Sequence, residues 1–268
     1  MIDLKIAMVC MHSALGHIDR NLDRIGQFVE TAAREGAQMI CFPEAAATGY
    51  ALKEPEKYCT AQDTVRIMDD LIQMGRDMKI VLIVGFVENS GGKKPYISQL
   101  ITGPEGFMGV YRKTHLSPTE ARIYGAGETL GVFVYDQWCF GLQLCYEAHF
   151  PEISTKMALS GAHLLLIPHA SPRSDPATKF DSWMRHLPAR AFDNGVFVAA
   201  CNPVGGNGGG LSFPGVALVL GPDGRLIKGF QGKEENVLMA VLKGETLTGI
   251  REHRMKYFLP RRRPELYP

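Results

Sequence analysis

Short runs of apolar residues, rich in β-branched side chains, recur along the whole chain and are typical of strands. In chain order they occupy residues 6–10, 39–42, 80–86, 99–102, 132–135, 140–144, 164–167, 196–200, 216–220 and 236–241. The turn sequence Gly-Pro-Asp-Gly at 221–224 separates two of the later runs and indicates a hairpin.

Helical spacing of apolar positions is found between some of these runs. Apolar residues three and four positions apart predict one helix over 18–32 and another over 68–78. A third helix is expected to start near Pro151, because proline suits a first helical turn, and a fourth between Trp183 and Asn194. Alternating strands and helices predict an α/β protein with a mixed sheet, but the pattern does not distinguish one sheet from two.

The composition favours an enzyme with a small-molecule substrate. A chain of 268 residues with 46% hydrophobic residues can form one large domain over residues 1–268. The net charge of +1 gives no reason to expect a nucleic-acid or membrane partner. Six dispersed cysteines without a Cys-x-x-Cys predict no disulfide framework, and eight scattered histidines predict no metal site. With no basic leader before the first apolar run, a cytoplasmic location is expected.

Cys145 is the strongest candidate for chemistry. It follows the apolar run 140–144 and precedes the helix expected near Pro151. A thiol at a strand-to-helix junction lies near backbone N–H groups and the positive end of a helix dipole, which both favour the reactive thiolate. The sequence therefore predicts a nucleophile here, although a buried structural cysteine is the alternative for this residue taken alone.

Three charged residues accompany this cysteine in the chain. Glu44 follows the run 39–42 and Pro43, where a carboxylate is suited to act as a base, but it would also suit a helix cap. Lys113 is suited to stabilise an oxyanion, with a surface charge as the alternative. Glu120 follows Ser117-Pro-Thr119, a sequence that equally suits a capping box.

Several motifs surround these residues in a fixed order. They are Phe42-Pro-Glu…Thr48-Gly-Tyr50, Arg112-Lys-Thr-His-Leu116, Leu144-Cys-Tyr-Glu147 with Phe150-Pro-Glu152, Ala189-Arg-Ala…Asn194, and Arg263-Pro-Glu-Leu-Tyr267. Together they resemble the nitrilase superfamily of carbon-nitrogen hydrolases over nearly the whole chain, whereas any one motif alone is weak. The resemblance implies a four-layer α/β/β/α sandwich with two mixed β-sheets and the site at one end of the strands.

The resemblance also implies roles for the charged residues. Cys145 is expected to be the nucleophile, Glu44 the general base and Lys113 an oxyanion donor together with the backbone N–H of Tyr146. Glu120 is expected to position water, and Glu147 to brace the site through hydrogen bonds. This chemistry needs no cofactor.

The C-terminal segment invites two interpretations. Residues 251–263 collect five arginines and a lysine with two aromatic residues, which is compatible with RNA binding. The family resemblance instead implies that 246–268 is a tail that packs on a partner subunit, so that a homodimer or higher homo-oligomer is expected. The glycine-rich stretch 205–210 misses the dinucleotide spacing, and a plain flexible loop is preferred to a phosphate cradle.

The residues after the nucleophile bear on the substrate. Typical nitrilases have Trp after the cysteine and aliphatic amidases tend to have Arg, so Tyr146 points away from both branches. Branches that act on carboxylate-bearing substrates often place an arginine three or four positions after the cysteine, where Ala148 and His149 stand here. A neutral or weakly polar amide is therefore predicted, unless His149 or Arg173 supplies a positive charge.

Several alternatives stay open from the sequence. His149 is equally suited to support another residue, Arg173 to pair with Asp175 on the surface, and Tyr50 to pack rather than to form a pocket wall. The function predicted first is a thiol-dependent amidase that releases ammonia from primary amides. An N-carbamoyl amine or acid amidohydrolase comes next, then a nitrilase. A catalytically silent scaffold of the same fold is the alternative outside the enzymes.

Overall fold

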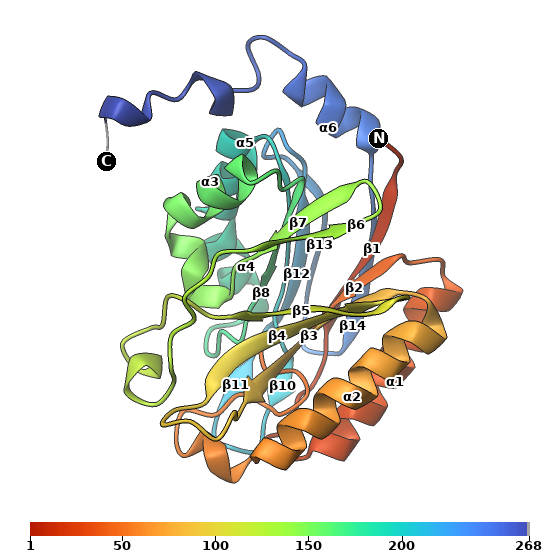
Figure 1. Cartoon of the computed structure of the whole chain (residues 1–268), viewed down its shortest axis with the longest axis vertical. Helices are drawn as coiled ribbons and strands as arrows, with labels where there is room; N and C mark the ends of the chain where they lie inside the picture. Colours follow the sequence, from red (N-terminus) through yellow and green to blue (C-terminus); the bar gives the residue numbers. More distant parts are fainter. Residues whose placement is uncertain (267–268) are drawn as a thin grey trace.

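Two six-stranded mixed sheets pack face to face between two layers of helices in the computed structural model, which describes residues 1–266 (Figure 1). The first sheet has the order β14 (Asn236–Leu242), β1 (Leu4–Cys10), β2 (Met39–Cys41), β3 (Val81–Glu88), β4 (Tyr96–Gly103), β5 (Gly106–Arg112). The second has the order β13 (Leu226–Gly232), β12 (Gly215–Leu220), β9 (Phe197–Cys201), β8 (Leu164–Pro168), β7 (Trp138–Leu142), β6 (Val132–Tyr135).

Each sheet has a parallel centre flanked by antiparallel strands. Strands β1, β2 and β3 are parallel to one another, as are β7, β8 and β9. The remaining pairs are antiparallel. The turn at 221–224 does join a hairpin, but its second strand is β13, whereas the predicted run 236–241 is β14 of the other sheet. Central strands such as β9 and β12 are buried along their whole length, which explains why they are almost continuously apolar.

Helices cover the outer face of each sheet. The first sheet is covered by α1 (Ile18–Arg34) and α2 (Ala61–Met78), and the second by α3 (Pro151–Leu159), α4 (Pro176–Met184) and α5 (Leu187–Asn194) (Figure 1). Helix α6 (Gly244–Arg251) follows β14. Short 3-10 helices are η1 (Pro55–Lys57), η2 (Glu120–Arg122), η3 (Cys145–His149), η4 (Leu259–Arg261) and η5 (Pro264–Leu266). The four-layer α/β/β/α sandwich expected from the family resemblance is confirmed.

The predicted elements differ from the observed ones at a few places. The apolar pattern missed β5 and β13, two edge strands that contain glycines and have exposed positions. The helix expected between Trp183 and Asn194 is confirmed as α5, which begins at Leu187, whereas α4, which ends at Met184, was not predicted. Pro188 lies in the first turn of α5, where its missing N–H costs no helical hydrogen bond.

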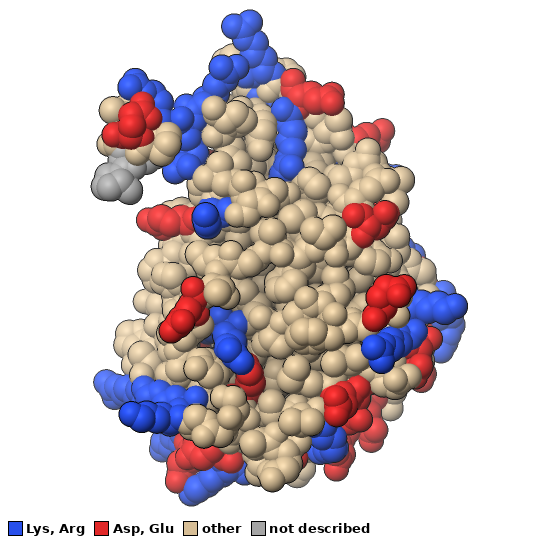
Figure 2. All heavy atoms as spheres, viewed as in Figure 1, with Lys and Arg blue, Asp and Glu red and all other residues tan. Residues whose placement is uncertain are grey.

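The glycine-rich stretch and the C-terminal segment also have defined structures. Residues 205–213 form a hairpin of β10 (Gly205–Gly206) and β11 (Ser212–Phe213) rather than an irregular loop. The chain after α6 extends along the outside of the molecule (Figure 1) and carries several of the basic side chains on the face shown in Figure 2. Tyr267 and Pro268, and with them the end of the predicted tail, lie outside the described residues. No helix within residues 1–266 is long and apolar enough to cross a bilayer.

Candidate active site

Glu44 lies directly beyond the carboxyl end of β2, in a turn fixed from three sides. Its backbone N–H donates to the carbonyl of His169 at 3.1 Å, and its Oε2 accepts the N–H of Ala170 at 3.0 Å. The turn passes so close to β3 that a Cβ on Gly85 would lie 2.4 Å from backbone atoms of Pro43 and Ala45. Glu44 is therefore a buried carboxylate held in one orientation, and the helix cap proposed as its alternative role is not formed by its side chain.

Lys113 follows β5 and is buried between two carboxylates. Its Nζ lies 2.7 Å from Oε1 of Glu44 and 2.7 Å from Oε1 of Glu120. These two charges hold the pKa of Lys113 above its usual value, against the opposing effect of burial. The ammonium is thus permanently charged in a site almost closed to solvent, which excludes the alternative of a surface charge.

Glu120 forms the local contacts of a capping box and also contacts Lys113. Its Oε2 accepts the N–H of Ser117 at 2.7 Å, and its own N–H donates to the hydroxyl of Ser117 at 3.4 Å, as in a capping box. Its Oε1 accepts both the ammonium of Lys113 and the hydroxyl of Tyr50, each at 2.7 Å. Burial raises the pKa of Glu120, but Lys113 outweighs burial, so that the pKa is lowered and Glu120 stays ionised.

Cys145 is the first residue of η3, at a sharp turn shortly after β7. Its φ of +46° is rare for a residue with a side chain, and the neighbouring backbone is fixed because Leu144 donates its N–H to Oε2 of Glu147 at 2.6 Å. Burial raises the pKa of the thiol to about 12; the charge of Glu44 adds to that effect and Lys113 opposes it. The resting site therefore holds a thiol rather than a thiolate, and it needs a base.

Glu44 has the properties of that base. Burial raises its pKa to about 7, with Lys113 acting in the opposite direction and Glu120 in the same direction as burial. A base whose pKa lies close to neutral pH can both accept and return a proton in one reaction cycle. Glu44, Lys113 and Glu120 are thus in direct contact, and electrostatic coupling links Cys145 to each of them.

Glu147 connects the turn of the nucleophile to the segment that carries Lys113. Its carboxylate is buried and accepts the hydroxyl of Tyr111 at 2.9 Å, the N–H of Thr114 at 2.7 Å and the N–H of Leu144. Tyr111 and Thr114 lie on either side of Lys113 in the sequence. The structure thus gives Glu147 the hydrogen bonds expected of a bracing residue.

The residues predicted to contact substrate fall into two groups. Tyr50 lines a cavity of about 260 Å³ and reaches Glu120 through its hydroxyl, and Tyr146 directly follows the nucleophile. His149 is exposed and stacks on His186 with ring centroids 4.7 Å apart. Burial, with a smaller contribution from Arg190, lowers the pKa of His149 below its usual value, so that His149 is neutral at pH 7.

Arg173 corrects a detail of the sequence analysis. Its side chain is exposed, and among the described residues it forms no ion pair with Asp175. The carboxylate of Asp175 instead caps α4, where it accepts the N–H and hydroxyl of Thr178 at 2.9 and 2.6 Å. The predicted surface pair is therefore wrong, because the start of a helix offers this carboxylate better-placed donors.

Sequence reasoning missed residues 169–171, which follow β8, and the side chains of Lys179 and Trp183 on α4. Ala170 donates to Glu44, Lys179 lies on α4, and Trp183 stacks on the buried His169 at a centroid distance of 4.1 Å. The sequence contains two signals that could have pointed to these residues. Residues 169–171 follow the carboxyl end of a predicted strand. Lys179 and Trp183 are four positions apart and so share one helix face.

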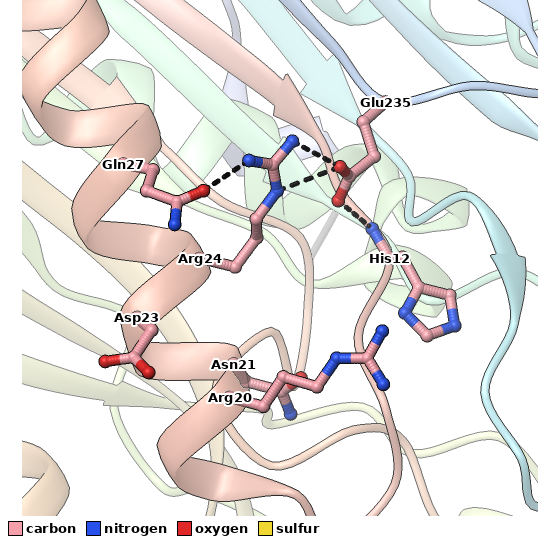
Figure 3. Close-up of a pocket in the computed structure, with 7 residues that line it drawn as sticks. All are labelled: His12, Arg20, Asn21, Asp23, Arg24, Gln27 and Glu235. Carbon is pink, nitrogen blue, oxygen red and sulfur yellow. Dashed lines mark hydrogen bonds and ion pairs between the residues drawn. The ribbon is translucent and has the colours of Figure 1, made fainter.

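A separate cavity of about 490 Å³ lies beside α1 (Figure 3). Arg24 donates to Glu235 and to Gln27 there, and Glu235 also accepts the N–H of His12. These contacts tie α1 to the segment that leads into β14. None of its lining residues belongs to the cluster around Cys145.

Comparison with known proteins identifies the family. The sequence model of the carbon-nitrogen hydrolases matches residues 5–252, and the chain belongs to that family. Among similar proteins, a nitrilase of Pyrococcus abyssi is 28% identical, with 98% of this chain and 99% of that protein covered. A 2-oxoglutaramate amidase of Bacillus subtilis is 28% identical over 88% of this chain and 90% of its own length.

A solved structure gives the most direct comparison with the site. A mutant of the amidase from Nesterenkonia sp. AN1 superposes with a TM-score of 0.86 at 26% identity, covering 98% of each chain. In that structure acrylamide has added to the active-site cysteine. The chain described here is accordingly a carbon-nitrogen hydrolase enzyme with a cysteine nucleophile.

Proposed function

We propose that this enzyme hydrolyses primary amides through a thioester on Cys145 and releases ammonia. The observation that carries the proposal is the buried cluster of Glu44, Lys113 and Glu120 around the turn that presents the thiol. The amidases among the similar proteins support amides as the substrate class. No organic cofactor enters the reaction as proposed.

The first half of the reaction forms the thioester. Glu44 takes the proton of Cys145 as the sulfur attacks the carbonyl carbon, and the carbonyl oxygen becomes an oxyanion. Lys113 and the backbone N–H of Tyr146 stabilise that oxyanion. When the C–N bond breaks, Glu44 gives its proton to the leaving nitrogen, and ammonia departs.

The second half regenerates the enzyme. Water attacks the thioester carbonyl carbon, and Glu44 takes one of its protons while Lys113 again stabilises the oxyanion. Collapse of this intermediate breaks the C–S bond, releases the carboxylic acid and returns a proton from Glu44 to sulfur. Glu120 keeps Lys113 in place and charged throughout, which is how it contributes to the handling of water.

The test is ammonia release from a panel of primary amides, N-carbamoyl amines and acids, and nitriles, with Cys145→Ala as control. Release from amides that disappears in the variant supports the proposal. Release from N-carbamoyl compounds together with carbon dioxide, or from nitriles alone, would replace it with one of the other two reactions. If neither the wild-type protein nor the variant releases ammonia from any compound of the panel, hydrolysis of these compounds is contradicted.

We further propose a cytoplasmic location. All six cysteines are free in the structure, and four of them are buried, as expected for a protein kept in a reducing compartment. Fractionation of cells that make the protein, with thiol labelling under denaturing conditions, tests this. Recovery outside the cytoplasm with fewer than six free thiols would contradict it.

A further inference from the structure

Lys179 is a cation next to the site without an anionic partner. It lies on α4, it is half-buried, and its ammonium donates to the hydroxyl of Ser171 at 2.7 Å and to the carbonyl of Pro172 at 3.4 Å. None of the carboxylates in residues 1–266 forms an ion pair with it. Two neutral oxygens therefore hold an ammonium that still has a third N–H to donate.

The position of this ammonium is fixed with respect to the catalytic base. Ser171, which holds it, follows Ala170, whose N–H donates to Glu44. Asn202 clamps Ser171 from both sides: Oδ1 accepts the N–H of Ser171 at 2.8 Å, and Nδ2 donates to its carbonyl at 3.1 Å. Two hydrogen bonds and one peptide link thus connect Lys179 to Glu44. Because Asn202 holds the backbone of Ser171 without help from Lys179, loss of the ammonium should leave this segment and Glu44 in place.

The charge of Lys179 acts toward the nucleophile. Burial lowers the pKa of Lys179, and the Cys145 thiol is the ionisable group that opposes this effect. A partly buried ammonium without an anion loses hydration that its neutral partners replace only in part. Such a group is stabilised when a bound ligand brings a carboxylate.

The residues that the sequence offered for this purpose are less suitable. His149 is neutral at pH 7, and Arg173 points its charge into solvent. Lys179 is the positive charge that combines partial burial, a fixed anchor and electrostatic contact with Cys145.

We propose that Lys179 is a specificity-determining residue that binds a carboxylate on the acyl part of the substrate, so that the preferred substrates are monoamides of dicarboxylic acids. This inference rests on the proposed amidase function. The carboxylate belongs to the acyl part because the nitrogen of a primary amide leaves as ammonia and carries no further group.

The experiment compares succinamate with butyramide, amides of equal carbon number of which only the first carries a carboxylate. Lys179→Met, which keeps an unbranched side chain and removes only its charged end, is expected to lower kcat/KM for succinamate at least ~10-fold, mainly through KM, because it removes a hydrogen bond between two charged groups. Butyramide hydrolysis is expected to stay unchanged. Lys233→Met is the matched control, since Lys233 is an exposed lysine beside the start of α4.

Three results would overturn the assignment. These are a wild-type preference for butyramide, an equal loss of activity on both amides in Lys179→Met, and a loss on succinamate in Lys233→Met as well. Failure of the wild-type enzyme on both amides would instead contradict the proposed amidase function. Titration of succinamate into Cys145→Ala, with and without Lys179→Met, measures the binding step alone, and weaker binding in the double variant is expected. If Lys179→Met does not fold, Lys179→Gln takes its place in both measurements.

Discussion

The ammonium of Lys113 lies 2.7 Å from Oε1 of Glu44, in a site where both side chains are buried. The same ammonium contacts Glu120 at the same distance, so that one cation stands between two carboxylates. Glu44 is thereby oriented by a charge that does not titrate near neutral pH, while its other oxygen is fixed by the N–H of Ala170. In the proposed role of base, Glu44 could therefore change its protonation state without losing its position.

Replacement of Lys113 by alanine should reduce turnover at least ~100-fold. An oxyanion donor contributes about 2.7–4 kcal/mol to transition-state stabilisation in comparable sites. The variant also leaves Glu44 and Glu120 buried without a cation, which is expected to cost about 3–5 kcal/mol of folding stability. Ammonia release and denaturant unfolding measure the two effects.

A double variant separates activity from stability at this position. Adding Glu120→Gln to Lys113→Ala removes one of the two uncompensated charges, so stability should recover in part while activity stays low. Lys93→Ala, at an exposed lysine, is the control and should behave like the wild-type enzyme. Near-normal turnover of Lys113→Ala would remove Lys113 from the mechanism.

The pH dependence of activity should follow Glu44. Burial raises its pKa from 4.5 to about 7, and the proposed reaction needs the carboxylate. For a neutral amide, kcat/KM is therefore expected to rise as pH increases through about 7. Glu44→Gln should lose at least ~100-fold in activity and no longer show this rise, since general-base catalysis contributes at least that much. A rise that persists unchanged in Glu44→Gln would assign the titration to another group.

The raised pKa of Glu44 has the opposite effect on folding stability, which should fall as pH rises. The folded protein holds a proton on Glu44 at pH values where the unfolded chain has released it. The stabilising contribution of Glu44 is therefore fully present below its unfolded pKa of 4.5 and is lost as pH rises through about 7. Comparison of the free energy of unfolding of the wild-type protein and Glu44→Gln across this window should show that difference.

We expect Glu147, although it lies beside the nucleophile, to contribute strongly to folding stability. Glu147→Ala would leave the hydroxyl of Tyr111 and the N–H groups of Thr114 and Leu144 without an acceptor. Each unsatisfied buried donor costs about 1–3 kcal/mol, so unfolding should require several kcal/mol less than in the wild-type protein. Denaturant unfolding checks this, with the exposed Glu152→Ala on α3 as control. Equal stability of the two variants would show that water replaces the lost acceptor.

The positions of the residues gathered around Cys145 are easier to read from the sequence than the edges of the fold. Glu44 and Cys145 each follow a buried parallel strand, and apolar runs locate the ends of such strands well. Strands β5 and β13 escaped notice because edge strands with glycines and solvent-facing positions lack a continuous apolar run. Helix α4 was missed because only Phe180 and Trp183 are buried among its nine residues, which is too few to give a helical apolar pattern.

The proposed role of Lys179 could not be predicted from the sequence, for a different reason. Its partner Ser171 lies in a connecting segment before α4, and the anchor of Ser171 is Asn202, far along the chain after β9. Such long-range side-chain contacts leave no periodic signal in the sequence. Glu120, in contrast, lies in a local sequence that suits a capping box, and one of its oxygens accepts the N–H of Ser117 while the other contacts Lys113.

We propose that the chain forms at least a homodimer through the segment after α6. This segment exposes Met255, Phe258 and Leu266, which are 72%, 44% and 63% accessible, on an extension that runs along the outside of the molecule (Figure 1). Apolar side chains on such an extension are stabilised when a second subunit covers them. Sedimentation should give a mass of at least twice 29.5 kDa, and removal of residues 254–268 should shift it toward the single chain. A wild-type protein that sediments only as a 29.5 kDa species would contradict the proposal, because the exposed side chains would then have no subunit to cover them.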